Sequence, residues 1–284
     1  MKQLIYITVF LVLGTSVSAQ QKSEKKILDQ ATLRCYYLFS KKNEGALKPF
    51  RSDTMVLDIG GQFSKFYDPA RLGRDSMLSA KMKEINAGNV KSIRVYKADA
   101  SKDLSGMPGT AASNTAEGES YQIIKNRKTQ KIRVLDYGSP VGDQFVYEDD
   151  PGQWLWKMSN EMDTISGYAC QKASLRFRGR DYTAWFSADI PMSDGPWKFS
   201  GLPGLILKVE DSQALFSFEL IGLKPLENPL PIVADESRSI KCSRAEFEQQ
   251  KQKQGNGMQI NANNGDVIIA ENPVNYDYIP MEKE

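Results

Sequence analysis

The chain has 284 residues, of which 40% are hydrophobic and 10% aromatic, and its formal net charge is only +2. Such a chain can bury a substantial core, and its balanced charge gives no reason to expect nucleic acid as a partner. It contains no histidine. This excludes Ser-His-Asp and Cys-His hydrolase sites and His-ligated zinc, copper or iron sites, and we expect no metal and no cofactor.

The N-terminus has the pattern of a secretory signal peptide. Lys2 precedes an apolar run over residues 4–13, and the small residues Val17 and Ala19 form a cleavage site. About ten apolar residues are too few for a permanent anchor across a ~30 Å hydrocarbon core. We therefore expect a signal peptide at 1–19, a periplasmic or secreted mature protein, and no permanent membrane anchor.

The first half of the mature chain is typical of strands with one helix. Residues 33–40, 53–59 and 62–67 alternate apolar and polar positions between polar turns, which predicts three strands. Residues 75–87 carry apolar side chains at helical spacing behind Asp75, which predicts a short amphipathic helix capped by that residue.

The middle of the chain begins with a long polar segment. Residues 98–120 are small and polar and predict a flexible loop, with a lid or a boundary between two sheets as alternatives. Residues 121–137 predict a hairpin, and strands follow at 144–148 and 154–158. Antiparallel sheet should therefore dominate.

Trp154 and Trp156 are two positions apart in the last of these predicted strands. They would then share one face of the strand, because side chains of a strand alternate between its faces. A pair of tryptophans on one face suits an aromatic binding platform or a packed core. The core is the more ordinary reading.

Residues 167–187 contain two alternating runs that meet in a predicted hairpin at 178–181. Arg176, Arg178 and Arg180 lie near its tip. They could bind a carboxylate or a phosphate through paired hydrogen bonds. A solvated hairpin end with ordinary ion pairs is the alternative.

The stretch 189–210 combines glycines and prolines between two strand-like segments. Pro203 fixes its own φ, while Gly195, Gly201 and Gly204 can adopt positive φ, so the stretch predicts consecutive tight turns that enter a buried strand. Further strands are expected at residues 205–209 and 215–223.

The C-terminal part predicts a helix and a turn. Ser243 and Glu246 form a capping-box pattern at the start of a polar helix that runs to about residue 254. Residues 261–266 are rich in Asn and Asp and predict a turn, but they lack the ladder of acidic ligands that an EF-hand calcium site needs.

Taken in chain order, about a dozen short strands and two or three short helices predict a mainly β fold. We expect an antiparallel curved sheet, a partly open barrel or a sandwich, as a single domain over residues 20–284. Cys35, Cys170 and Cys242 lie far apart without a C-x-x-C pair. They predict either one disulfide with one buried thiol or three buried thiols.

The hexapeptide Gly-Leu-Pro-Gly-Leu-Ile at residues 201–206 resembles the signature of the GLPGLI family of secreted bacterial proteins. The runs at 165–173, 179–186 and 190–199 are similar to this family in order and spacing, whereas residues 272–279 depart from its usual ending. The resemblance implies secretion and a β-rich fold. The family has no established activity or catalytic residues, so it implies no active site.

Three functions fit these observations. The first is a non-enzymatic protein that binds an unknown protein or an apolar ligand of the cell envelope, and the candidate surface consists of Arg178, Arg180, Trp185, Trp197 and Phe199. The second is a hydrolase without histidine or metal that uses paired carboxylates, drawn from Asp149, Asp150, Asp181, Asp189 and Asp194. The third is an assembly factor or chaperone, which would need an exposed apolar patch.

Overall fold

The computed structural model describes residues 26–49, 51–84, 92–97, 118–137, 144–236, 239–253, 257–263, 266–272 and 279–283. The predicted signal peptide at 1–19 and most of the predicted loop at 98–120 therefore lie outside the described residues. Within the described part, strands dominate and two helices are present. None of the described helices is both long and apolar enough to cross a membrane.

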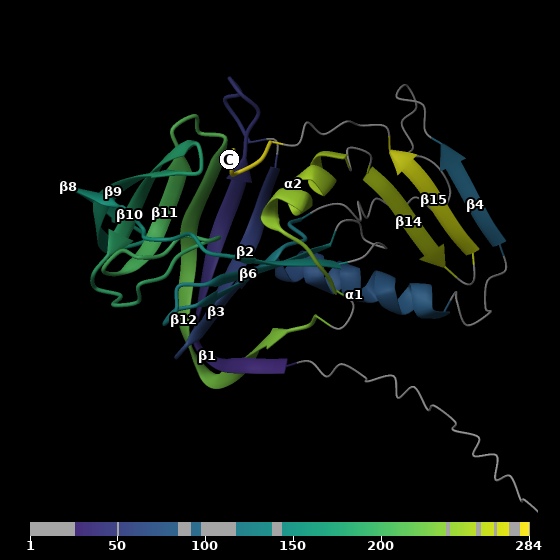
Figure 1. Ribbon diagram of the computed structural model, residues 1–284, viewed down its shortest axis with the longest axis horizontal. Helices are drawn as coiled ribbons and strands as arrows, with labels where there is room; N and C mark the ends of the chain where they lie inside the picture. The colour runs from purple at the N-terminus through teal and green to yellow at the C-terminus, as the bar shows by residue number, and fades with distance from the viewer. Residues whose placement is uncertain are drawn as a thin grey trace, which may run out of the picture.

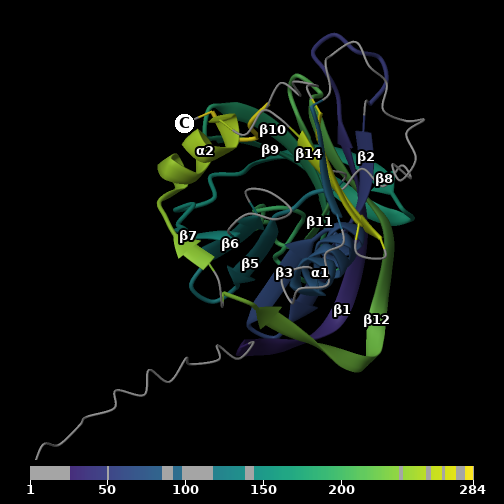
Figure 2. The ribbon, with the colours of Figure 1, turned by 90° about the vertical axis from the view of Figure 1, so that its right-hand side faces the viewer.

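A single open sheet of 12 strands forms most of the described molecule, in the order β13-β7-β6-β5-β3-β2-β1-β12-β11-β10-β9-β8. The strands are β1 (Lys26–Lys41), β2 (Arg51–Gly60), β3 (Phe63–Tyr67), β5 (Gln122–Asn126), β6 (Ile132–Tyr137), β7 (Gln144–Asp149), β8 (Lys157–Ile165), β9 (Tyr168–Phe177), β10 (Arg180–Ser187), β11 (Leu205–Asp211), β12 (Phe216–Ala234) and β13 (Ser239–Lys241). Neighbours pair antiparallel except β13, which runs parallel to β7. Figure 2 shows this sheet curving round an interior. The predicted curved antiparallel sheet is confirmed.

A smaller sheet has three strands in the order β14-β15-β4. It consists of β4 (Ser92–Lys97), β14 (Gly257–Asn263) and β15 (Asp266–Asn272), with β15 parallel to β4. Figure 1 shows it at the opposite end of the molecule from β8. The sequence predicted only a turn at residues 261–266, whereas 261–263 end β14 and Asp266 begins β15.

Helix α1 spans Pro69–Glu84 and begins earlier than predicted. Its cap is Asp68, whose Oδ1 accepts a hydrogen bond from the Arg71 N–H at 2.9 Å. Pro69 occupies the first helical position, where the missing N–H costs nothing. Asp75 is not a cap; it lies one turn into the helix and accepts a hydrogen bond from Arg71 Nε at 2.8 Å.

The predicted strand at 154–158 is also wrong, because β8 begins only at Lys157. Trp154 and Trp156 precede the strand, and their rings stack with centroids 6.4 Å apart. Trp156 Nε1 donates a hydrogen bond to the Ser200 carbonyl oxygen at 2.8 Å. The two half-buried tryptophans therefore pack against the Gly/Pro stretch, which we call the turn block and define as residues 189–204.

The glycines of the turn block serve two different purposes. Gly201 has φ of +90°, as predicted, whereas Gly195 and Gly204 do not have positive φ. A Cβ atom on Gly204 would lie 2.1 Å from the Ser187 carbonyl oxygen, and one on Gly195 would lie 2.8 Å from the Ile206 side chain. These two positions require glycine because the chain passes close to its neighbours there.

The hydrophobic core lies between the layers of the curved sheet and is rich in aromatic rings. Phe39 stacks on Phe218 with centroids 4.3 Å apart, and Phe66 meets Phe218 edge to face. A second group of rings surrounds Phe199, which is completely buried. Such ring pairs stabilise a core beyond the area that they bury.

All three cysteines are free thiols. Cys35 and Cys170 are buried, and Cys242 is partly buried. Of the two arrangements that the sequence allowed, three separate thiols are found.

Candidate functional site

A cavity of about 90 Å³ lies between β5, β6 and β7, the helix α2 (Arg244–Lys253) and the segment 279–283. We call it the α2 cavity. Its apolar lining includes Ile123, Val134, Phe216, Phe247 and Trp197. The helix is held in place by the predicted capping box: Ser243 N–H donates to Glu246 Oε2 at 2.7 Å, and Glu246 N–H donates to Ser243 Oγ at 3.2 Å.

One polar group of the α2 cavity has no bonding partner. The Tyr121 hydroxyl is buried and makes no hydrogen bond within the part of the chain that the structure describes. Burial, reinforced by the charge of Glu119, raises the pKa of Tyr121 well above its usual value. The hydroxyl therefore stays protonated and can donate a hydrogen bond. An unpaired buried hydroxyl is costly, so a bound acceptor would stabilise it.

Glu119 lies beside Tyr121 and is held as an anion. Lys41 Nζ lies 2.6 Å from Glu119 Oε1, and Arg51 Nη2 lies 3.2 Å from the same oxygen. Burial opposes ionisation of Glu119, but the charges of Lys41 and Arg51 outweigh it and lower the pKa of the carboxyl below its usual value. A carboxylate in this state is not suited to act as a general acid.

Ser120, Asp136 and Lys251 meet at the same wall. Lys251 Nζ lies 2.8 Å from Asp136 Oδ2 and 3.4 Å from Ser120 Oγ, which donates to Asp136 Oδ1 at 2.5 Å. In hydrolases without histidine, a serine and a lysine can serve as a nucleophile and its base. Here the Ser120 hydroxyl donates to Asp136 and not to Lys251, so the lysine is not placed to accept its proton.

Lys198 and Glu282 line the cavity and belong to a charged cluster with Asp149, Arg178 and Arg244. Lys198 Nζ lies 2.8 Å from both Asp149 Oδ2 and Glu282 Oε1, and Arg178 binds the same two carboxylates at 2.5 and 2.8 Å. Burial opposes ionisation of Asp149, but the hydrogen bond from Arg178 and the charge of Lys198 lower its pKa to about 2. Asp149 is therefore ionised near neutral pH.

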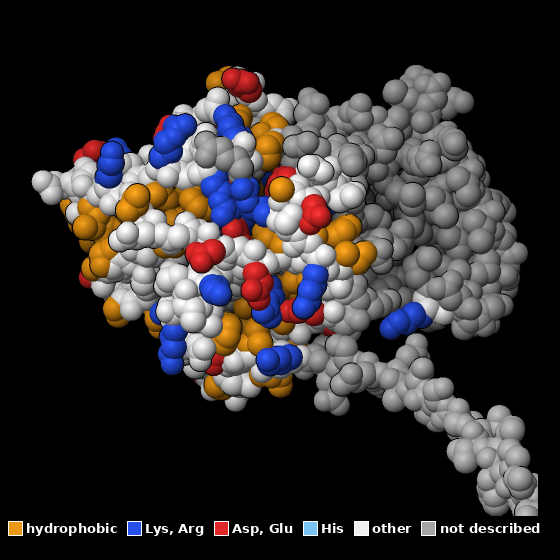
Figure 3. Space-filling model, viewed as in Figure 1, with side chains coloured by type: hydrophobic (Ala, Val, Ile, Leu, Met, Phe, Trp, Pro, Cys, Tyr) orange, Lys and Arg blue, Asp and Glu red, His pale blue; other side chains and the backbone are white. Residues whose placement is uncertain are grey.

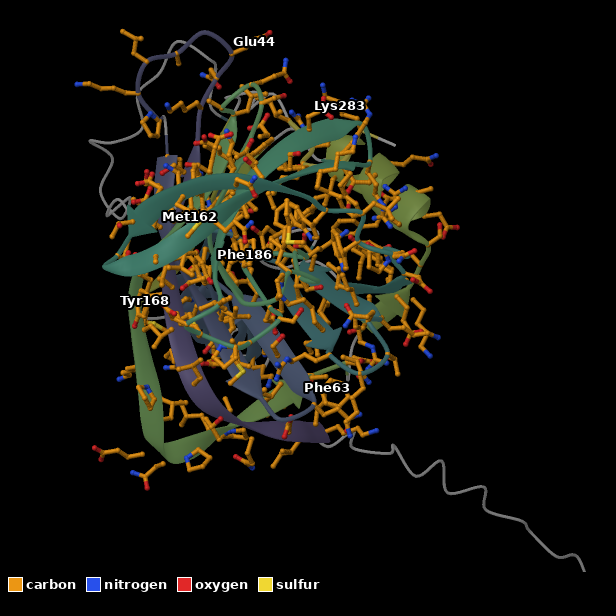
Figure 4. The ribbon with its side chains drawn as sticks, turned by 90° about the vertical axis from the view of Figure 1, so that its left-hand side faces the viewer. Glu44, Phe63, Met162, Tyr168, Phe186 and Lys283 are labelled. Atoms are coloured by element: carbon orange, nitrogen blue, oxygen red, sulfur yellow. The ribbon has the colours of Figure 1, made fainter. Side chains whose placement is uncertain are left out.

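The segment 279–283 is bound to the β9–β10 hairpin. Arg180 Nη2 donates to the Pro280 carbonyl oxygen at 2.8 Å, and the Tyr182 hydroxyl donates to the Met281 carbonyl oxygen at 2.7 Å. The Lys283 N–H donates to the Arg178 carbonyl oxygen at 2.9 Å. Figure 4 shows Lys283 next to α2, Phe186 in the interior and Met162 on the outer strands.

The five residues of the predicted binding surface do not form one exposed surface. Trp197 and Phe199 are buried in the aromatic group of the core, and Arg178 and Arg180 lie beneath the segment 279–283. Trp185 is half-exposed, with Lys172 Nζ 5.9 Å from its ring centroid, and Arg178 is partly accessible. The hairpin tip is therefore not a solvated end, except at Arg176, which pairs with the exposed Asp181 at 3.0 Å. A role of these residues in binding stays a prediction.

The candidate carboxylates are placed in different surroundings. Asp149 belongs to the charged cluster, Asp181 and Asp150 are exposed, and Asp189 is exposed at the start of the turn block. Asp194 is buried and lies 2.5 Å from Lys125 Nζ. Asp149, Asp181 and Asp194 are each bound to a cation. In the described ranges, no group of three or more His, Cys, Asp or Glu residues could hold a metal ion.

Tyr121, Glu119 and Glu282 were missed by sequence analysis. Tyr121 was read only as the start of a hairpin, and Glu282 lies in a short polar stretch without periodicity. Nothing local marks them, because the α2 cavity joins segments from both ends of the chain. The only signal in the sequence is Glu282 itself, an acidic residue between an apolar residue and a lysine.

Part of the chain matches one protein family. Residues 176–208 match the model of a family described as a protein of unknown function, Porph_ging. The match contains the Gly-Leu-Pro-Gly-Leu-Ile hexapeptide and is consistent with the GLPGLI resemblance. No curated protein matches the chain.

The fold is similar to that of PNGF-II as solved in the P21 space group, with a TM-score of 0.50 and 13% sequence identity. The similarity covers 82% of this chain but only 35% of PNGF-II. A second structure of PNGF-II, in the C2 space group, gives a TM-score of 0.49 at the same identity and coverage. At this identity the likeness concerns the β-rich fold alone.

Proposed function

We propose that this β-rich protein is a non-enzymatic binding protein of the periplasm or the medium. Its ligand or partner inserts a small apolar group with a hydrogen-bond acceptor into the α2 cavity. This proposal rests on the buried Tyr121 hydroxyl, which has no hydrogen-bond partner among the described residues. Such a group is expected to have a partner in the functional state, because leaving it unpaired costs about 1–3 kcal/mol.

The size and lining of the cavity support a small apolar group. A volume of about 90 Å³ exceeds the space of one water molecule but is well below that of a typical ligand pocket. Phe216, Phe247 and Trp197 supply apolar surface, while Tyr121 supplies one donor. An ester, ketone or amide oxygen on a short apolar chain, or one side chain of a partner, suits this arrangement.

The charges favour binding over hydrolysis. Asp149 and Glu119 are held as anions by neighbouring cations, and Lys251 is paired with Asp136. A pair of carboxylates for glycoside or ester hydrolysis would need separated pKa values, with one group protonated near neutral pH. Neither Asp149 nor Glu119 meets this requirement.

The test is native mass spectrometry of the mature protein, purified without denaturation from the envelope fraction and the medium of its own host. We expect a bound molecule on the wild-type protein. The Tyr121→Phe variant should retain at least about tenfold less of it, because the donor is lost while the shape is kept. Tyr168→Phe, on β9 and away from the cavity, should retain the wild-type amount.

The proposal is contradicted if all three proteins show bare masses and no envelope extract changes their tryptophan fluorescence. Equal retention by wild type and Tyr121→Phe would place the ligand elsewhere. The two failures differ: the first rejects ligand binding, and the second rejects only the α2 cavity as its site.

A further inference from the structure

The segment 279–283, with the sequence Ile-Pro-Met-Glu-Lys, is bound in the manner of a peptide ligand. Its main chain makes four hydrogen bonds to the β9–β10 hairpin: one carbonyl oxygen accepts two from Arg180, a second accepts one from Tyr182, and one N–H donates to the Arg178 carbonyl oxygen. Main-chain bonds of this kind hold extended peptides on protein surfaces without regard to their sequence.

Side-chain recognition comes from Glu282. Its carboxylate lies 2.8 Å from both Arg178 Nη1 and Lys198 Nζ, and 3.5 Å from Arg244 Nη1. Three cations therefore meet at a position that contains one other anion, Asp149. Without Glu282 the cluster would have a surplus of two positive charges in a largely buried place. It is thus built to accept a carboxylate.

The apolar side chains of the segment complete the contact. Ile279 and Met281 line the α2 cavity and pack against the core cluster. They form one of its walls together with Glu282. While this wall is in place, the cavity has room for a small group only, and its removal would open the cavity along the length of the segment.

We infer that the groove occupied by residues 279–283 also accepts an extended acidic segment of a partner protein, which refines the binding role proposed above. The partner segment carries a glutamate two residues after a proline, with apolar residues flanking that proline. It displaces residues 279–283, places its carboxylate among Arg178, Lys198 and Arg244, and inserts an apolar side chain beside Tyr121.

Two observations support exchange of the segment. The charged side chains that hold it remain partly accessible at Arg178 and Arg244, which are 16% and 28% exposed. Figure 3 shows basic side chains gathered beside the end of the chain labelled in Figure 1, on a face that otherwise mixes both signs of charge. A basic group at the surface would attract an acidic segment before the groove opens.

The test uses the full chain and a fluorescein-labelled synthetic peptide with the sequence of residues 277–283. Wild type should bind it weakly, because its own segment competes. Glu282→Gln loosens that segment, and we expect it to bind the peptide about tenfold or more tightly than wild type. The matched control is Glu161→Gln on β8, which alters an exposed ion pair with Lys172 and should behave as wild type.

Recognition of the carboxylate is tested with a peptide that has glutamine in place of its glutamate. It should bind Glu282→Gln about tenfold more weakly than the acidic peptide. Hydrogen exchange at residues 279–283 shows whether the segment has been released. If Glu282→Gln does not fold, Met281→Ser weakens the segment without changing the cluster and should give the same result.

The inference is overturned if a folded variant with a released segment binds neither peptide, or binds both equally. If this happens while Tyr121→Phe still loses the bound molecule, only the peptide partner is rejected and the ligand cavity remains. If the Tyr121→Phe test fails and the peptide binds, the groove recognises peptides without a ligand in the cavity.

Discussion

Lys125 Nζ lies 2.5 Å from Asp194 Oδ1, and both side chains are buried. The same ammonium donates to the carbonyl oxygens of Gly195 and Phe199 at 2.5 and 3.2 Å. Asp194 in turn accepts a main-chain hydrogen bond from the Ile206 N–H. This ion pair thus attaches the turn block to β5 and to the start of β11.

Replacing Lys125 by methionine should lower the free energy of unfolding by about 3–5 kcal/mol, because the buried Asp194 carboxylate loses its closer cation and keeps only Arg127, at 3.7 Å. Urea unfolding followed by circular dichroism measures this change. Lys172→Met removes an exposed ion pair with Glu161 and should cost less than about 1 kcal/mol. Similar losses for both variants would contradict the role assigned to the pair.

Gly204→Ala should lower the free energy of unfolding by about 2 kcal/mol or more, since the new Cβ atom would overlap the Ser187 carbonyl oxygen. Gly61→Ala is the matched control, because a Cβ atom there meets nothing within 4 Å. Thermal and urea unfolding of both variants give the comparison. An unchanged melting temperature for Gly204→Ala would show that the backbone at Gly204 and Ser187 can separate to make room for the Cβ atom.

Protonation of Asp149 should make the protein less stable in acid. Its pKa falls from 3.8 to about 2 on folding, so its stabilisation is complete above pH ~4 and is lost as the pH falls through about 2. The loss is about 2 kcal/mol. Asp149→Asn should show a flatter stability curve between pH 4 and 2, whereas Asp150→Asn, an exposed neighbour, should keep the wild-type slope. Parallel curves for wild type and Asp149→Asn would exclude this contribution.

The thiols should be nearly inert in the native protein. Burial raises the pKa of Cys35, Cys170 and Cys242 above the usual value, so little thiolate is available at pH 8. A thiol reagent should leave Cys35 and Cys170 unmodified and label the partly buried Cys242 slowly; Cys242→Ser should remove that slow phase. All three should react in urea without a reducing agent. If only one thiol reacts in urea, the other two form a disulfide.

Local patterns predicted the elements whose stabilising contacts are also local. The hairpins over 121–137 and 167–187 follow from alternation around a tight turn, and the capping box at Ser243 and Glu246 follows from spacing alone. The start of α1 was missed although Asp68 followed by Pro69 is a recognisable start signal. The apolar spacing further along the helix obscured it.

The candidate site could not be predicted in the same way. Arg178 and Arg180 are close to a hairpin tip, and the segment 279–283, about a hundred residues further along the chain, partly covers them. Tyr121 becomes a cavity residue only because α2 packs across β7. Such contacts depend on the tertiary fold, which the periodicity of a single segment does not encode.

The central strand pair joins the two halves of the chain. β1 (Lys26–Lys41) pairs along most of its length with β12 (Phe216–Ala234), which belongs to the last third of the sequence. Closing so long a loop costs entropy before any contact compensates it, and sheets built in this way fold slowly. A growing chain therefore cannot complete this sheet until residue 234 has been synthesised. Until then β1 has one unpaired edge, at which aggregation or a chaperone can act.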